Sequence, residues 1–74
     1  MTEKQITDLG WVLVKQYTHD EFRTNRYYLG CMEIEFTYEG DELVSLDMSS
    51  SELIGMPLDE RKIILLTELI GNWR

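Results

Sequence analysis

Apolar and polar residues alternate in the middle of the chain. Over residues 32–38 the apolar positions are Met32, Ile34, Phe36 and Tyr38, and the positions between them are Glu33, Glu35 and Thr37. A period of two is typical of a β-strand with one buried and one exposed face. A second alternation, with Val44, Leu46 and Met48 as its apolar set, follows over residues 43–48. We therefore predict an antiparallel hairpin that turns near Gly40, because glycine tolerates the positive φ of a turn.

The register of this hairpin follows from the residues that must share a face. A slip of one residue would turn a whole strand over, so Val44, Leu46 and Met48 must lie on the same face as Ile34 and Phe36. The numbers of paired residues must then have an even sum, which requires an odd number of residues in the loop. We predict a loop of three or five residues with a left-handed Gly40, rather than a two-residue primed turn.

Two further segments, residues 11–18 and 22–29, are rich in β-branched and aromatic residues and are predicted to be strands. The first begins with apolar residues on both faces, which predicts burial on both sides at its start. Gly30 either ends the second segment or forms a bulge within one long strand. The pattern therefore leaves three or four strands open, and it favours a four-stranded meander.

Both ends of the chain carry helix signals. Thr2 and Gln5 match a capping box, and Gly10 stands where a left-handed C-terminal cap belongs, which predicts a short helix over residues 2–9. Near the other end, Asp59 is a good N-cap, and Leu58 and Ile63 are spaced as a hydrophobic staple. We predict that the second helix begins after Asp59 and ends at Gly71.

The predicted C-terminal helix is amphipathic. A core-facing stripe about 120° wide contains Ile63, Leu66, Leu69, Ile70 and Trp73. Ile64 and Leu65 fall outside this stripe, and a run of four apolar residues is more than a surface helix of a monomer requires. Either the helix is deeply buried against the sheet, or Ile64 and Leu65 mediate self-association as a homodimer.

Together these elements predict a single α+β domain over residues 1–74. Its expected parts are a short N-terminal helix, a three- to four-stranded antiparallel β-meander, and an amphipathic C-terminal helix packed on one sheet face. A chain of 74 residues has no room for a second domain. We expect no membrane span, because no apolar run is long enough, and no signal peptide, because the first residues lack a basic-then-apolar pattern. The single cysteine fits a reducing compartment. We expect a cytoplasmic protein.

Negative charge is concentrated in the hairpin and the segment after it. The net charge is −7, and residues 33–60 contain nine acidic residues and no Lys or Arg. This charge disfavours nucleic acid and anionic membranes as direct partners and favours a protein with a basic surface. The candidate partner-binding residues are Glu33, Glu35, Glu39, Asp41, Glu42 and Asp47. The plainer alternative is that the acidity keeps a small protein soluble.

No catalytic or metal-binding constellation emerges from the sequence. His19 lies beside Asp20 and Glu21, but consecutive turn residues point apart and no second histidine completes a site. Glu33 and Glu35 lack the pocket and the unequal environments that paired catalytic carboxylates require. We therefore expect no enzymatic activity, no metal and no cofactor.

The helix–strands–helix order resembles the double-stranded RNA-binding domain. That family's basic positions at the start of its last helix are matched here only by Arg61 and Lys62, which follow Asp59 and Glu60. Because the net charge is −7, RNA binding is not the expected function.

In size and acidity the chain is similar in kind to bacteriophage-encoded inhibitors that imitate nucleic-acid charge. We therefore expect a small non-catalytic interaction module, an inhibitor or charge mimic, that uses the 33–47 hairpin. The alternative is a structural or assembly protein that self-associates through its C-terminal helix.

Overall fold

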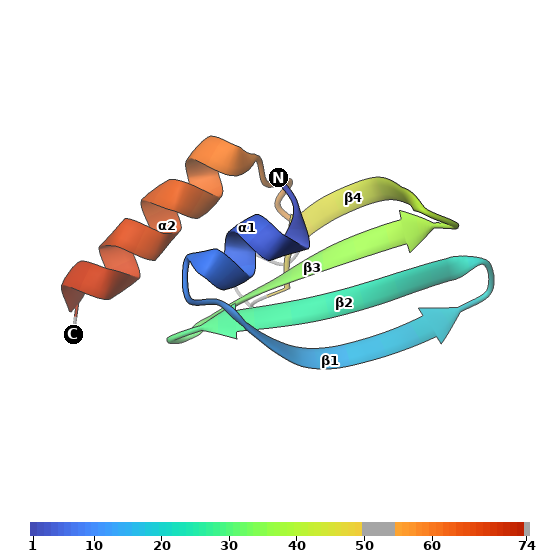
Figure 1. The fold of residues 1–74 in the computed structure, drawn as a ribbon, viewed down its shortest axis with the longest axis horizontal. Coiled ribbons are helices and arrows are strands. Elements are labelled where there is room, and N and C mark those ends of the chain that lie inside the picture. The colour runs from blue at the N-terminus through green and yellow to red at the C-terminus, as the bar shows by residue number, and fades with distance from the viewer. Residues whose placement is uncertain (50–54, 74) are drawn as a thin grey trace.

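The computed structural model describes residues 1–49 and 55–73, and it has the predicted α+β architecture. The elements in chain order are α1 (Glu3–Asp8), β1 (Val12–His19), β2 (Phe22–Leu29), β3 (Met32–Glu39), β4 (Glu42–Met48) and α2 (Glu60–Trp73). The four strands form one antiparallel sheet in the order β1-β2-β3-β4 (Figure 1). Of the two strand counts that the sequence left open, the four-stranded meander is therefore confirmed.

All three hairpin turns of the meander contain two residues: Asp20-Glu21, Gly30-Cys31 and Gly40-Asp41. The first residue of each turn has a positive φ, 54° at Asp20, 60° at Gly30 and 62° at Gly40, and the second does not. This combination is the pattern of a type II′ turn, whose twist matches that of the flanking strands. The left-handed Gly40 is confirmed, but the predicted three- or five-residue loop is wrong.

A β-bulge reconciles the short turn with the predicted faces. Ile34 pairs with Met48 and Phe36 with Leu46, so these residues share a face as expected. The register shifts by one residue between Thr37 and Tyr38, which leaves Val44 as an extra residue in β4. Val44 is consequently 46% exposed, so its predicted place on the buried face is wrong. Ile34, Phe36, Leu46 and Met48 therefore share a face as predicted, but the extra residue lies in β4 and not in the loop.

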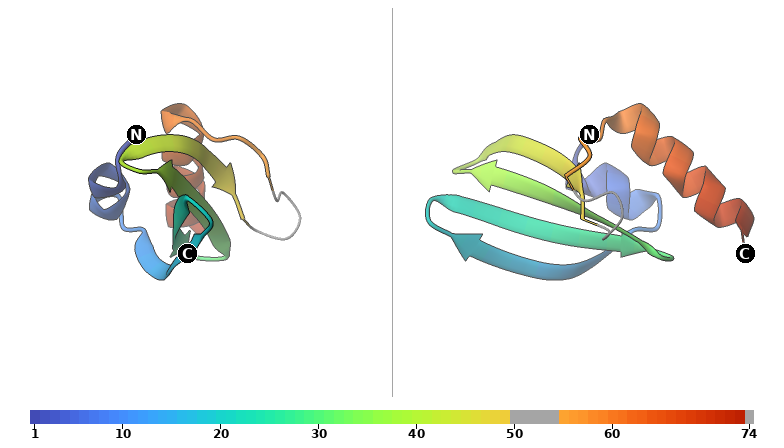
Figure 2. Two further views of the ribbon diagram at one scale, coloured as in Figure 1. Left: turned by 90° about the vertical axis from the view of Figure 1, so that its right-hand side faces the viewer. Right: turned by 180° about the vertical axis from the view of Figure 1, so that it is seen from behind.

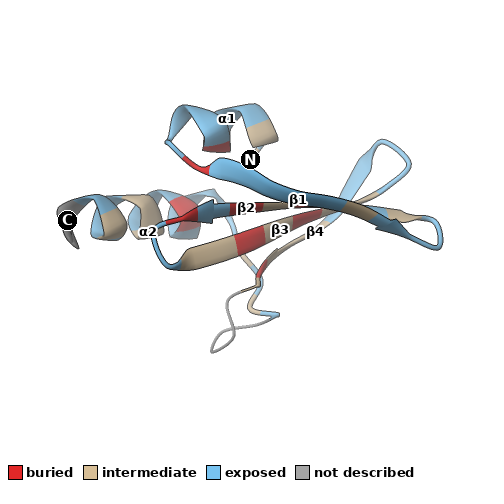
Figure 3. Ribbon diagram, turned by 90° about the horizontal axis from the view of Figure 1, so that it is seen from below, coloured by how far each residue is buried: buried red, intermediate tan, exposed pale blue. Residues whose placement is uncertain are grey.

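The hydrophobic core lies on one face of the sheet, under α1 (Figure 3). Its buried members are Ile6, Trp11, Tyr27, Leu29, Ile34, Phe36, Met48 and Ile63. α2 contributes Ile63, with Leu66 and Ile70 packed against the cluster. The C-terminal half of α2 extends beyond the end of the sheet at the β2–β3 turn (Figure 2).

Two of the burial predictions fail at the margins of the molecule. β1 is an edge strand, and Val12, Leu13 and Val14 are 48%, 42% and 52% exposed, so its start is not buried on both faces. Leu69 is 57% exposed rather than core-facing, whereas the next residue, Ile70, packs against the core cluster. The side chain of Trp73, the other terminal member of the predicted stripe, lies outside the described residues.

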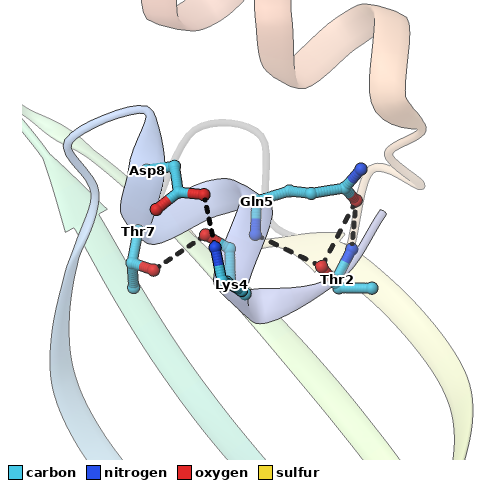
Figure 4. Close-up of polar contacts among 5 residues, drawn as sticks. All are labelled: Thr2, Lys4, Gln5, Thr7 and Asp8. Atoms are coloured by element: carbon cyan, nitrogen blue, oxygen red, sulfur yellow. Dashed lines mark hydrogen bonds and ion pairs between the residues drawn. The ribbon is translucent and has the colours of Figure 1, made fainter.

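The helix caps agree with the sequence at three of four positions. Thr2 is the N-cap of α1, with reciprocal bonds from Gln5 N to Thr2 Oγ1 (3.2 Å) and from Thr2 N to Gln5 Oε1 (2.7 Å) (Figure 4). Gly10 follows the helix with φ 101°. Asp59 caps α2 by accepting from Lys62 N at 2.9 Å. The predicted end at Gly71 is wrong, because Gly71 keeps a negative φ and α2 continues to Trp73.

Candidate functional site

The structure divides the six predicted partner-binding carboxylates into two groups. Glu33, Glu35 and Asp47 lie on the sheet face opposite the core, whereas Glu39, Asp41 and Glu42 lie at the β3–β4 turn. Glu33 and Glu39 are at opposite ends of β3, about 20 Å apart at a strand rise of about 3.3 Å per residue. The hairpin is therefore not one continuous acidic surface.

On the open sheet face, Arg26 from β2 neutralises much of the expected negative charge. Arg26 stands opposite Glu35 in the register, and its Nη2 and Nε donate to Glu35 Oε1 at 2.6 and 3.0 Å. Its Nη1 lies 3.9 Å from Glu33 Oε1, and Tyr17 Oη donates to Glu35 Oε2 at 3.1 Å. The hydrogen bonds from Arg26 to Glu35 raise the pKa of the guanidinium, so it remains charged. Glu33 and Glu35 are thus engaged within the sheet.

Asp47 completes this group from β4. It lies directly opposite Glu35 in the register, so two carboxylates face each other across the strand pair. Asp47 is half-buried and forms no ion pair with any residue that the structure describes. The two negative charges of Glu35 and Asp47 repel each other, and the positive charge of Arg26, on the other side of Glu35, offsets that repulsion.

At the opposite end of the sheet, two neighbouring hairpin turns form a second group, which we call the acidic tip (Figure 1). Its members are Asp20, Glu21, Glu39, Asp41 and Glu42, all of them exposed. None of them forms an ion pair within the described part of the chain. The nearby guanidinium of Arg23 lies over the ring of Tyr38, 4.8 Å from its centroid. The acidic tip therefore brings five exposed carboxylates together without an ion pair to any described residue.

The sequence correctly placed Glu39, Asp41 and Glu42 around a turn at Gly40, but Asp20 and Glu21 were not recognised as part of the same group. These two residues read only as a solvated turn. The meander brings them to the tip because alternate turns of an antiparallel meander lie at the same end of the sheet. The signal was present in the ten-residue spacing of the turns, at residues 20–21, 30–31 and 40–41.

A short row of aromatic rings adjoins the acidic tip on the open sheet face. The ring of His19 lies 5.9 Å from that of Tyr17 and 5.9 Å from that of Phe22. Lys15 Nζ covers the other end of the row, 5.2 Å from the centroid of Tyr17. His19 is therefore the last residue of β1, inside an aromatic row, rather than part of a polar turn. Within the described residues, no group of three or more His, Cys, Asp or Glu could hold a metal ion.

Glu3 makes a second polar network, between α1 and the core face, that sequence reasoning did not find. Its Oε1 accepts from Asn25 Nδ2 at 2.8 Å and from Tyr27 Oη at 2.7 Å, and its Oε2 accepts from Tyr38 Oη at 2.5 Å. Burial raises the pKa of Glu3, but the three hydrogen bonds and the charge of Arg23 outweigh it and hold that pKa below its ordinary value.

The two tyrosines that donate to Glu3 have pKa values shifted upward, opposite to the shift of Glu3. Burial and the hydrogen bond to Glu3 raise the pKa of Tyr27 and of Tyr38, so both phenols remain donors at neutral pH. Asn25, Tyr27 and Tyr38 thus each donate a hydrogen bond to the one carboxylate of Glu3. The network therefore fastens α1 to the sheet, and it offers no free group for chemistry.

The outer face of α2 carries the residues predicted to mediate self-association. Ile64 is 38% exposed and Leu65 is 56% exposed, and Leu69, which sequence analysis placed in the core, joins them at 57%. Around Ile64 and Leu65 the helix surface is shallowly hollowed, and the lining residues are Asp59, Arg61, Lys62, Ile64, Leu65 and Glu68. This hollow is open and mixed in polarity, so it suits a protein surface better than a small molecule.

The single cysteine is not part of any of these sites. Cys31 is an exposed free thiol in the β2–β3 turn.

Among the residues that the structure describes, no helix is long and apolar enough to cross a membrane.

Comparisons with protein-family models, with curated proteins and with solved structures find no match to this chain.

Proposed function

We propose that this protein is a small non-catalytic interaction module that binds a basic protein surface through its acidic tip. The observation that carries the proposal is the gathering of five exposed carboxylates on two adjacent turns, with no ion pair to any described residue. Unpaired exposed charge steers a partner of opposite sign and fixes its orientation. The aromatic row beside the tip supplies the kind of side chain that anchors protein interfaces.

The local structure of the tip costs stability, which supports a role beyond solubility. Glu39 and Glu42 are directly paired across the β3–β4 turn, and like charges in that arrangement are destabilising. Asp20 holds a φ of 54° at the turn position where the other two turns have glycine. Non-glycine residues in the left-handed region cost free energy and are concentrated at functional sites. Solubility alone would not require charge in these costly positions.

The chemistry of the tip defines the class of partner. A row of carboxylates presented on two turns imitates the charge of a phosphate backbone, so the fitting partner is a protein whose surface binds nucleic acid. The module would then act as an inhibitor by occupying that surface, without binding nucleic acid or a membrane itself. An exposed free thiol at Cys31 is compatible with work in a reducing compartment, and we propose the cytoplasm.

The test compares three baits in a pull-down from lysate of the native host at about 50 and 500 mM salt. They are the wild type, the tip variant Glu39→Gln/Glu42→Gln, and the control Asp8→Asn/Glu60→Gln. Both variants lose two exposed charges, but only the first loses them at the tip. We expect wild type and control to retain the same basic protein at low salt, and the tip variant to lose it. Equal capture by all three baits, or no capture by wild type, would refute the proposal.

The captured protein is then purified and its affinity is measured directly by titration calorimetry. Removing two exposed charges at the centre of an electrostatic interface is expected to weaken binding about tenfold or more. The same variant should fold at least as stably as wild type, because it removes a like-charge pair. Loss of binding with unchanged or increased stability separates recognition from unfolding.

A second candidate function, assembly through α2, is favoured by the exposure of Ile64 and Leu65 on the outer face of that helix. The two candidates use opposite ends of the molecule, because the acidic tip and α2 lie at opposite ends of the sheet (Figure 1). They are therefore compatible, and variants of one surface leave the other intact.

A further inference from the structure

The outer face of α2 has a charge pattern that is complementary to itself. Arg61, Ile64, Leu65 and Glu68 are spaced i, i+3, i+4 and i+7, which places them in one row along a helix. At about 100° per residue, this row points away from the buried Ile63. Its order is basic, apolar, apolar, acidic. We propose that a second copy of this chain docks on this row, with the two α2 helices antiparallel, and this inference rests on the second candidate function above.

The antiparallel arrangement follows from the charges. A two-fold axis between Ile64 and Leu65 sets Ile64 of each copy against Leu65 of its partner, and Arg61 of each copy against Glu68 of its partner. Both contacts at the ends of the row are then opposite-charge pairs. In a parallel arrangement Arg61 would face Arg61 and Glu68 would face Glu68, so both end contacts would repel. A row with this order of charges fits only the antiparallel dimer.

The described surroundings leave these side chains available. Neither Arg61 nor Glu68 forms a hydrogen bond or ion pair with another described side chain, and both are exposed. Ile64 and Leu65 form part of the shallow hollow on the outer face of α2. Lys62, beside the row, is already engaged through its Nζ with the carbonyl of Pro57 at 3.2 Å. The row therefore needs no rearrangement of the core before a partner helix can contact it.

The size of this surface predicts a weak dimer. α2 has 14 residues, so it is about 21 Å long at a rise of 1.5 Å per residue. One face of such a helix is smaller than the roughly 800 Å² per partner of a standard interface. Leu69, exposed at the flank of the row, adds apolar area to the contact. We expect a monomer–dimer equilibrium with a dissociation constant in the micromolar range.

Dimerisation in this manner would make the protein bivalent. The acidic tip lies at the far end of the sheet from α2, so a dimer through α2 would leave both tips free (Figure 2). A partner with repeated basic sites would then bind the dimer with avidity as well as through each single contact.

Charge reversal tests both the surface and the orientation. Arg61→Glu and Glu68→Arg each create like-charge pairs in a homodimer, and each should raise the dissociation constant at least tenfold in sedimentation velocity runs from about 1 to 500 µM. An equimolar mixture of the two variants restores opposite charges at both end contacts, because one copy then carries Glu at positions 61 and 68 and the other carries Arg at both. The mixture should therefore form a heterodimer. The double variant Arg61→Glu/Glu68→Arg should recover the wild-type constant. Lys4→Glu, an equal charge reversal on α1, is the control and should not change it.

The outcomes distinguish this inference from the proposed function of the tip. A wild type that remains monomeric at 500 µM, or single variants that dimerise as wild type does, would overturn the antiparallel dimer. Recovery in the double variant excludes misfolding as the cause of dissociation. Glu39→Gln/Glu42→Gln should dimerise normally, so failure of tip binding leaves the dimer unaffected, and the reverse also holds.

Discussion

Replacing Glu3 with glutamine tests whether one carboxylate fastens α1 to the sheet. The substitution keeps the shape of the side chain and removes its charge. Gln Oε1 can still accept from Asn25 and Tyr27, but its amide nitrogen would face the hydroxyl that Tyr38 now donates to Glu3. The bond to Tyr38 would have to reverse, with the amide N–H donating to the hydroxyl oxygen, and all three bonds would lose the assistance of the negative charge. α1 has only six residues and depends on such tertiary contacts to persist.

The magnitude follows from the three bonds. Hydrogen bonds to a charged group contribute about 1.5–3 kcal/mol each and neutral ones about 0.5–1.5 kcal/mol. Because Glu3 is only half-buried, we take the low end of the difference and expect a loss of about 2 kcal/mol of unfolding free energy at pH 7. In a domain of this size, that loss lowers Tm by roughly 8–16 °C. Urea unfolding followed by circular dichroism measures the free energy, and a thermal scan measures Tm.

The pH dependence gives the second part of this test. The pKa of Glu3 in the folded state is below its ordinary value of 4.5, so the folded protein binds this proton less readily than the unfolded chain does. The stabilisation by Glu3 is therefore complete above about pH 4.5 and is lost as the pH falls through the lowered folded value. The difference between wild type and Glu3→Gln should shrink over that acidic range.

The matched control is Glu21→Gln, in the exposed β1–β2 turn, which should change stability by less than about 0.5 kcal/mol. If Glu3→Gln is as stable as wild type at pH 7, the carboxylate does not hold α1. If its deficit is the same at pH 3 as at pH 7, the deficit does not come from the charge.

Three further predictions concern the turns and the open face. Gly40→Ala should lower the unfolding free energy by about 1 kcal/mol, because alanine is strained at the positive φ of this position. Gly30→Ala should lower it by about 2 kcal/mol, because its Cβ would also lie 2.9 Å from Ile70 Cγ2. Equal losses in urea unfolding would show that Ile70 of α2 does not restrict this turn. Asp20→Gly should stabilise the protein by about 0.5 kcal/mol by relieving the left-handed φ, and a loss of stability would contradict the strain assigned to this turn. Arg26→Gln should destabilise by about 1–2 kcal/mol, because it leaves two carboxylates of β3 without their cation; a change below about 0.3 kcal/mol would mean that the pairing is only a surface contact.

Local features of this protein were predictable from a few consecutive residues. The capping box of Thr2 and Gln5, the left-handed Gly10 and the N-cap Asp59 are each determined within one helical turn. The alternation of β3 likewise identified Ile34 and Phe36 as core residues, because a period of two separates the faces of any strand.

The candidate sites were less predictable, because they depend on which residues meet across strands. The sequence correctly placed Glu39 beside an exposed turn, and Ile64 and Leu65 on the exposed side of α2. It could not show that Glu35 is paired, because that depends on Arg26 lying opposite it in the β2–β3 register. A shift of one residue in either turn would have put Arg26 on the other face of the sheet.

The sequence by itself determined the order of helices and strands, the core face of β3 and the net negative charge, since each is a property of local pattern or composition. Only the tertiary structure decided where that charge remains uncompensated. The three two-residue turns bring Asp20 and Glu21 beside the β3–β4 turn, the bulge at Val44 keeps the predicted faces together, and the register brings Arg26 to Glu35. These outcomes depend on single-residue differences in turn length and strand pairing. The alternation of apolar and polar residues along one strand does not specify them, because it is the same whichever residue of the neighbouring strand lies opposite.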